Sequence, residues 1–164
     1  MFVIDASTLE VRPARQGEAP AVNALLHELG YPANTDEEVT ERLARWSERD
    51  NLLVLVAASE QQVVGVAALA LVPYFERPGC WGRVVALVVD ARSRGLGVGR
   101  KLLAATEQAA LARGCVSMEI SSARRRIDAH AFYHSVGYID RCNESARFFK
   151  NLVPGASDHA HASR

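Results

Sequence analysis

Three glycines at alternate positions, Gly95, Gly97 and Gly99, form the turn of this chain whose residue types and spacing best suit ligand binding. The turn follows a valine-rich apolar run and leads into a segment with helical periodicity from about Val98. Glycines lack the Cβ atoms that keep a ligand away from the backbone, and the first amides of a helix point unpaired into that space. Three cations stand at the same place: Arg94, Arg100 and Lys101. Since the positive end of the helix dipole adds to their charge, the turn predicts a site for phosphate oxygens.

Two common phosphate-binding patterns do not fit this turn. The dinucleotide pattern G-x-G-x-x-G, begun at Gly95, needs glycine where Arg100 stands. The P-loop pattern G-x-x-x-x-G-K-[ST] fails at the same residue, and Leu102 stands where it needs serine or threonine. A tight turn without any ligand is the alternative, but the place of the turn between an apolar strand and a helix start favours a binding site.

The segment Arg94-x-x-Gly97-x-Gly99, after Leu87-x-Val89 on a strand, resembles the acetyl-coenzyme A signature of the GNAT N-acetyltransferase family. The resemblance extends over residues 9–152. It implies transfer of an acetyl group from acetyl-CoA, the cosubstrate, to a primary amine by direct attack in a ternary complex. Two alternatives from other classes stay open: a non-catalytic acetyl-CoA sensor of the same fold, and an interaction module whose glycine turn binds nothing.

The resemblance also assigns roles to individual residues of the cofactor site. Backbone amides of the turn are expected to bind the pyrophosphate of CoA: those of Gly95, Gly97, Gly99 and Arg100. Arg94 is expected to order the loop or to meet a phosphate. The backbone of Leu87 and Val89 is expected to pair with the pantetheine arm as an added strand.

A later motif of the family is similar to residues 129–138, where a helix carries Phe132-Tyr133 and ends at Gly137. In many members this tyrosine is the general acid, so Tyr133 is the candidate here. A phenol of pKa about 10 can hydrogen-bond to a departing thiolate of pKa about 8.5 and protonate it. The alternative is that Tyr133 only belongs to the apolar stripe of its helix.

The base and the acceptor site have weaker signals. Glu119 is the candidate to take the proton of the amine, because the strand 84–89 carries no carboxylate. A solvent-facing glutamate and a water relay are its alternatives. Acceptor contacts are expected from the loops 29–36, with Tyr31 as the candidate, and 74–81. His130 and His134 have metal-ligand spacing but no third ligand, so no metal site is predicted.

Hydrophobic periodicity places these residues on an alternating series of elements. The expected order is strand, two helices, three strands, helix, strand, helix and two strands, with the last two at 138–139 and 146–149. This order predicts an α/β (α+β) fold, with a mixed central sheet of about six to seven strands flanked by about four helices. The family resemblance implies that the fourth and fifth strands, here 84–89 and 116–121, splay apart.

Length and composition limit the class of protein. The 164 residues suit a single acetyltransferase domain over 1–153, followed by a tail at 154–164 that is expected to be disordered. Lys plus Arg and Asp plus Glu both number 19, so the neutral chain is not expected to bind nucleic acid or membranes. The expected partner is a small-molecule or peptide amine, and a homodimer is compatible with the sequence.

Cysteine usage and hydropathy favour a cytoplasmic location. Cys80, Cys115 and Cys142 are odd in number and widely spaced, which predicts neither a disulfide framework nor a zinc site. The N-terminus lacks the pattern of a signal peptide. The longest apolar run, residues 63–73, is far shorter than the roughly 18 residues that cross a bilayer.

Overall fold

A computed structural model describes residues 8–60 and 62–153 of the chain. The described residues form two compact units, one that ends at Ser121 and one that begins at Ser122. The first unit contains β1 (Glu10–Pro13), η2 (Gln16–Glu18), α1 (Ala19–Leu29), α2 (Asp36–Ser47), β2 (Leu52–Ser59), β3 (Gln62–Pro73), β4 (Cys80–Val89), η3 (Ala91–Ser93), α3 (Val98–Ala112) and β5 (Cys115–Ile120). The second contains α4 (Ile127–Ser135). A single domain over 1–153 stays a prediction.

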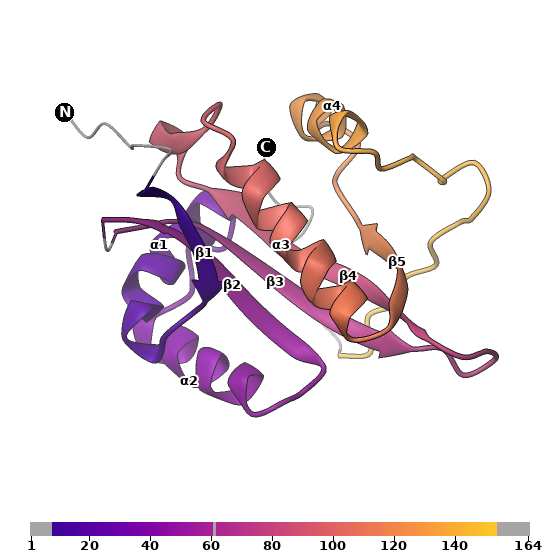
Figure 1. Cartoon of the computed structure of the whole chain (residues 1–164), viewed down its shortest axis with the longest axis horizontal. Coiled ribbons are helices and arrows are strands. Elements are labelled where there is room, and N and C mark those ends of the chain that lie inside the picture. The colour runs from indigo at the N-terminus through magenta and orange to yellow at the C-terminus, as the bar shows by residue number, and fades with distance from the viewer. Residues whose placement is uncertain (1–7, 61, 154–164) are drawn as a thin grey trace. The chain divides into compact units, whose positions relative to one another are not determined.

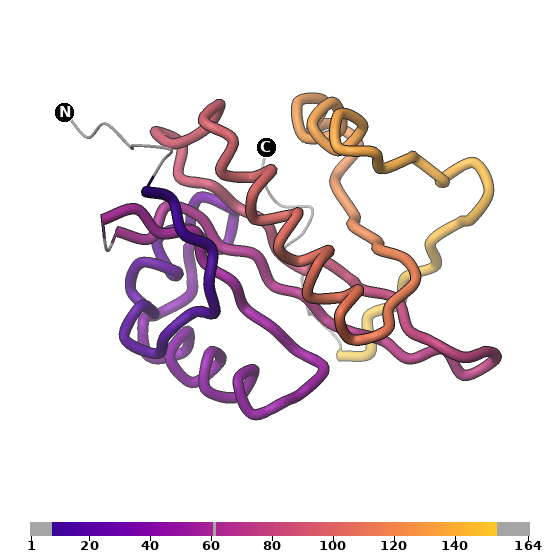
Figure 2. The backbone as a smooth tube through the Cα atoms, viewed as in Figure 1, coloured from indigo at the N-terminus to yellow at the C-terminus, as the bar shows by residue number. Residues whose placement is uncertain are grey.

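The first unit is built on one sheet with the strand order β1-β2-β3-β4-β5 (Figure 1). The first three strand pairs are antiparallel, and β4 and β5 are parallel. A parallel pair needs a crossover, which α3 supplies between β4 and β5 (Figure 2). The βαβ unit and the mixed sheet expected from the sequence are therefore confirmed.

Helices cover both faces of this sheet. On one face α1 and α2 pack with β2, β3 and β4 around a core that includes Val39 and Val56. On the other face α3 packs with the same strands through residues such as Leu102, which is fully buried. Because β2 and β3 are buried on both sides, they read as continuous apolar runs rather than alternating ones.

Local signals set the ends of α1 and α2. Gly30 closes α1 in the left-handed conformation, with φ of 114°, a region that favours glycine. Thr35 caps α2: its hydroxyl accepts the Glu38 N–H at 3.2 Å, and the Glu38 carboxylate accepts the Thr35 N–H at 3.0 Å. The loop between the two helices is thus fixed at both ends, and this loop carries Tyr31.

The second half of β4 differs from the first in its neighbours. Leu69 of β3 pairs with Val84, and the preceding Ala68 pairs with Ala86, which leaves Val85 as an extra, bulged residue of β4. Its pairing with β5 ends at Val84, opposite Ile120, whereas β4 continues to Val89. Among the described residues, 86–89 therefore pair with β3 alone.

Two of the predicted strands do not form. The sheet of the described residues has five strands instead of six to seven, and residues 138–139 and 146–149 are irregular. The Asp140 carboxylate accepts the Cys142 N–H at 2.9 Å, a local turn that bends the chain directly after residue 139. This bond, together with Arg124, lowers the pKa of Asp140 to about 2. The segment 146–149 buries little, since Phe148 is 94% exposed.

The expectation for the cysteines is corrected as well. Cys80 and Cys115 are joined by a disulfide, while Cys142 is free and exposed. The pair is 35 residues apart in sequence, but the crossover through α3 makes the two residues register partners at the start of β4 and β5. The wide spacing of these cysteines in the sequence therefore gave no indication of the disulfide, which depends on the strand topology.

Among the described residues, no helix is both long and apolar enough to cross a bilayer. The cytoplasmic location stays a prediction. The tail expected at 154–164 lies outside the described residues.

Candidate functional site

The glycine turn opens the space in front of α3. Gly95 and Gly97 adopt left-handed backbone angles, with φ of 77° and 79°, and Gly97 is the N-cap of the helix. A Cβ built on either glycine would meet no atom of the described residues within 4 Å. The N-cap has no side chain to accept the first amides of the helix, and Gly99 follows in the first turn. The backbone is thus exposed where a phosphate would bind.

The charges at the start of α3 are the reverse of those that stabilise a helix. The first turn of α2 contains Asp36, Glu37 and Glu38, as the helix dipole prefers. The first turn of α3 lacks an acidic residue, and Arg100 and Lys101 stand there instead. Together with the positive end of the helix dipole, these two side chains give the start of α3 the charge that attracts an anion.

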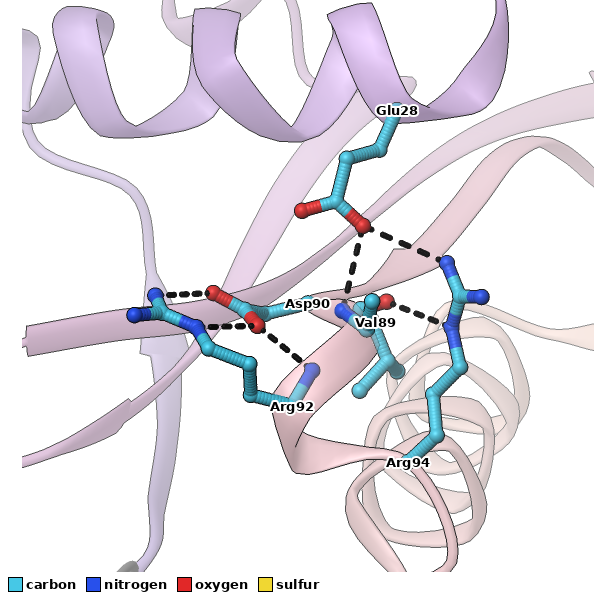
Figure 3. A network of polar contacts seen from close by, with 6 residues as sticks. Glu28, Val89, Asp90, Arg92 and Arg94 are labelled. Atoms are coloured by element: carbon cyan, nitrogen blue, oxygen red, sulfur yellow. Dashed lines mark hydrogen bonds and ion pairs between the residues drawn. The ribbon is translucent and has the colours of Figure 1, made fainter. Parts of the chain in front are cut away.

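A network of polar contacts holds the loop that leads into the turn (Figure 3). Glu28, near the end of α1, accepts the Ala91 N–H at 3.1 Å and the Arg94 guanidinium at 3.3 Å. Arg94 also donates from Nε to the Val89 carbonyl at 3.1 Å. Arg94 therefore ties the end of β4 to α1; its role toward a cofactor stays a proposal.

Asp90 and Arg92 form a second, local part of the same network (Figure 3). The Asp90 carboxylate accepts the Arg92 backbone N–H at 2.8 Å and pairs with its guanidinium at 2.7 Å. The hydrogen bond from the Arg92 side chain lowers the pKa of Asp90. Asp90 thus caps η3 and fixes the chain directly after β4.

Leu87 and Val89 lie on the part of β4 that β5 does not reach. Their register partners on β3 are Ala67 and Gly65, and their side chains pack toward α3. Of the backbone groups, the Val89 carbonyl already accepts Arg94. The edge of residues 85–89 that faces away from β3 is the place at which an extended ligand could add as a strand.

A cavity of about 240 Å³ lies on the opposite face of the sheet, between α1, α2 and the strands β2, β3 and β4. Its walls are mainly apolar, and the bulged Val85 and its neighbour Ala86 belong to them. Four residues with polar groups line it: Tyr31, Asn34, Arg42 and Trp46. Tyr31, the acceptor candidate, is 38% exposed there. The second predicted acceptor loop, 74–81, does not contribute to its lining.

Glu119 is held by a cross-strand ion pair. It faces Arg83 in the register of β4 and β5, and the two side chains meet at 2.5 Å. The Glu119 side chain is 51% exposed. Arg83 also donates to the Ser121 hydroxyl at 3.3 Å. These contacts give Glu119 a structural role in the pairing of β4 and β5. Its role as a base stays a proposal.

Tyr133 lies on α4, in the second unit. Its ring packs against Phe132 and Tyr138, with centroid distances of 5.4 and 6.2 Å. Burial raises the pKa of the Tyr133 phenol above its ordinary value, and Arg126 lowers it by less. A phenol with a raised pKa keeps its proton at neutral pH, as a general acid must.

Sequence reasoning missed Glu28, Arg42 and the bulge at Val85. Glu28 had a signal, because an acidic residue near the C-terminus of a helix opposes the dipole and needs a partner elsewhere. Arg42 has no such signal, because a single arginine on an amphipathic helix does not distinguish a solvated face from the rim of a cavity. The bulge depends on strand register, which the apolar sequence of β4 leaves open.

The comparisons with known proteins agree with this fold. The model of the acetyltransferase (GNAT) family matches residues 20–138. The aminoalkylphosphonate N-acetyltransferase of Salmonella typhimurium is 31% identical over 134 residues, 79% of this chain and 84% of that protein. The glucosamine-6-phosphate N-acetyltransferase of Arabidopsis thaliana superposes with a TM-score of 0.76 at 22% identity, over 89% of this chain and 99% of the other. An aminoglycoside N-acetyltransferase in complex with CoA superposes with a TM-score of 0.76 at 16% identity, over 88% of this chain and 95% of the other.

The fold is therefore that of an acetyltransferase. The chain belongs to the GNAT acetyltransferase family, by the family match over most of its length and by its curated relative.

Proposed function

We propose that the protein transfers the acetyl group of acetyl-CoA to a primary amine by direct attack in a ternary complex. One observation carries this proposal: the glycine turn at the start of α3, with its open space and its cations, directly follows a strand edge that β5 leaves unpaired. A pyrophosphate and an extended amide-containing arm are the two parts of CoA that suit these two features.

The residues of the turn and of β4 would hold the cosubstrate. The amides at Gly95, Gly97, Gly99 and Arg100 would bind the pyrophosphate oxygens. The backbone of Leu87 and Val89 would pair with the pantetheine arm, and Arg94 would keep the end of β4 and the turn in place. The CoA complex of a structural relative with the same fold supports this use of the site.

The chemistry then removes two protons from the acceptor ammonium, one before attack and one from the nitrogen of the tetrahedral adduct, and supplies one proton to the thiolate; the proton from the adduct replaces the one that the general acid gives up. The free amine attacks the thioester carbonyl, and collapse of the tetrahedral adduct breaks the C–S bond and releases CoA as a thiolate. Tyr133 is the proposed donor to that thiolate, since its raised pKa keeps the phenol protonated. Glu119, directly or through one water, is the proposed acceptor of the proton that the ammonium loses; its ion pair with Arg83 would have to loosen for this step.

Relatives support a small amine as the acceptor. The curated relative is named for aminoalkylphosphonates and one structural neighbour for glucosamine-6-phosphate, and both names describe small amines with an anionic group. A second neighbour is named for aminoglycosides, which are polycations. We propose a small-molecule acceptor on this basis; a homodimer and a cytoplasmic location also stay proposals.

The test combines binding and turnover. Acetyl-CoA at about 100 times its Kd should add about 2.7 kcal/mol to the free energy of unfolding. A panel of primary amines is then assayed for release of free CoA thiol, with mass spectrometry to confirm N-acetylation of the amine. Stabilisation without turnover on any amine would support the sensor alternative, and the absence of stabilisation would refute both.

A further inference from the structure

The cavity between α1, α2 and the sheet has a lining that selects among amines. Arg42 is the one charged residue among the described residues that line it, and the remaining walls are mainly apolar. A polycationic amine would meet no carboxylate among these lining residues. An apolar group, by contrast, gains free energy in proportion to the area that it buries against these walls.

The volume of the cavity suits one ring or one branched alkyl group. An apolar cavity of about 150 Å³ can hold benzene. The cavity here measures about 240 Å³, which leaves room for a ring and a short linker. Tyr31 and Trp46, both in the lining, add aromatic surface against which a ring could pack.

Arg42 is held in position by the loop between α1 and α2. Its guanidinium donates to the Asn34 side-chain oxygen at 2.9 Å, and the Asn34 amide donates to the Tyr31 carbonyl at 3.2 Å. The Asn34 carbonyl in turn accepts the buried Asn23 amide at 3.2 Å. Among the described residues Arg42 forms no ion pair, so its charge remains available to an anion.

The cavity also reaches the strand at which acetyl transfer is proposed. The bulge in β4 places Val85 and Ala86 in its lining. The next residues of β4, 87–89, are those proposed to pair with the pantetheine arm. A ligand in the cavity would therefore lie beside the backbone at which the thioester is expected.

We propose that this cavity is the acceptor site and that the acceptor is a primary amine with both an apolar and an anionic group. The apolar group, an aromatic ring or a branched alkyl chain, fills the cavity, and the anion, a carboxylate or phosphonate, pairs with Arg42. The identification of this ligand as an acceptor rests on the proposed acetyl transfer, but its binding does not, and the experiment measures the two separately.

Binding is measured by the fluorescence of Trp46. The chain contains two tryptophans, so a Trp81→Phe variant isolates the signal of the one that lines the cavity. Phenylalanine, which has both groups, should change the emission saturably. Phenylethylamine lacks the anion and 2-aminoethylphosphonate lacks the ring, and each should bind about tenfold more weakly or worse. Spermidine, a polycation, should not compete with phenylalanine.

Two variants and a control assign the contacts. Ala68→Leu adds a side chain to the lining and should weaken phenylalanine binding at least tenfold; CoA binding by calorimetry reports that the variant is folded. Arg42→Gln should bring the affinity for phenylalanine down to that for phenylethylamine. Arg45→Gln removes an exposed arginine of the same helix outside the lining and should change neither affinity.

The results separate this proposal from the proposed function. Unchanged emission with phenylalanine, or unchanged affinity in Arg42→Gln, overturns the assigned ligand class. Tighter binding of spermidine than of phenylalanine to the cavity also overturns the assigned ligand class. Concentration-dependent dimerisation that Ala68→Leu abolishes would show that a second copy covers the cavity, which also overturns it. Phenylalanine binding without acetylation, in protein that binds CoA, refutes the proposed transfer and leaves the ligand class standing.

Discussion

Replacement of Gly97 by valine tests the cofactor site at its most constrained residue. Gly97 has a φ of 79°, and an added Cβ would meet open space among the described residues. The substitution therefore has one cost to the unliganded protein, the left-handed backbone, which is about 1–2 kcal/mol for a residue with a Cβ. For a chain of this length that lowers the Tm by about 2–8 °C, and the protein should still fold.

Gly114 supplies the matched control. It lies just beyond the other end of α3, its φ is 82°, and a Cβ there would also meet open space in the described part of the chain. Gly114→Val should therefore lose about as much stability as Gly97→Val. The two variants differ only in whether the new side chain stands in front of the first amides of the helix.

Thermal unfolding with and without CoA measures the difference. At about 100 times its Kd, CoA should raise the Tm of the parent and of Gly114→Val by about 5–11 °C, from about 2.7 kcal/mol of binding free energy. Gly97→Val should show almost no rise. An equal rise in both variants would refute the assignment of the turn as the pyrophosphate site, whatever the loss of stability.

Four further results are expected. Glu28→Gln should weaken CoA binding about two- to fivefold in calorimetry, because it loses a half-exposed ion pair worth at most about 1 kcal/mol; unchanged affinity would mean that the network does not order the turn. Tyr133→Phe should lower kcat by about 10²-fold or more without changing the Kd of CoA. In the wild type, the raised pKa of the Tyr133 phenol should place the loss of rate at alkaline pH above pH about 10. Full kcat of Tyr133→Phe at every pH would contradict the role of Tyr133 as the general acid. Glu119→Gln should lower kcat/KM near neutral pH, and its kcat/KM should approach the wild-type value at high pH. With two amines of different pKa, a pH profile that follows the pKa of the amine in both the wild type and the variant would exclude Glu119 as the base. Reduction of the disulfide between Cys80 and Cys115 should lower the free energy of unfolding by about 3–4 kcal/mol in denaturant melts, and a Cys80→Ser variant should not respond to the reductant.

The sequence predicted those parts of the fold that local chemistry decides. The continuous apolar runs of β2 and β3 are typical of central strands, and both strands are buried on two faces. The end of α1 at Gly30 and the start of α2 at Thr35 are of this kind, since the left-handed cap and the capping box depend on only a few neighbouring residues. The glycine turn was predicted in the same way.

Features that depend on contacts distant in the chain were not predicted. The disulfide needs Cys80 and Cys115 to become register partners, and nothing in their spacing shows this. The strand expected at 138–139 contains two apolar residues, but the turn at Asp140 follows them at once. The cavity is formed by two helices and three strands, so the role of Arg42 in its lining appears only after folding.

Helix α1 connects the two proposed binding sites through neighbouring residues. Leu26 and Leu29 line the cavity proposed for the acceptor, and Glu28, between them in sequence, accepts hydrogen bonds from the loop before the glycine turn. On a helix, successive residues point about 100° apart, so one turn can face the cavity with two leucines and the loop with a glutamate. A shift of α1 on acceptor binding would move Glu28 as well, and with it the contacts of Arg94 and Ala91. The affinity for CoA should therefore depend on the acceptor in the parent protein, and this dependence should weaken in Glu28→Gln, because the variant loses the carboxylate that links α1 to the loop before the turn.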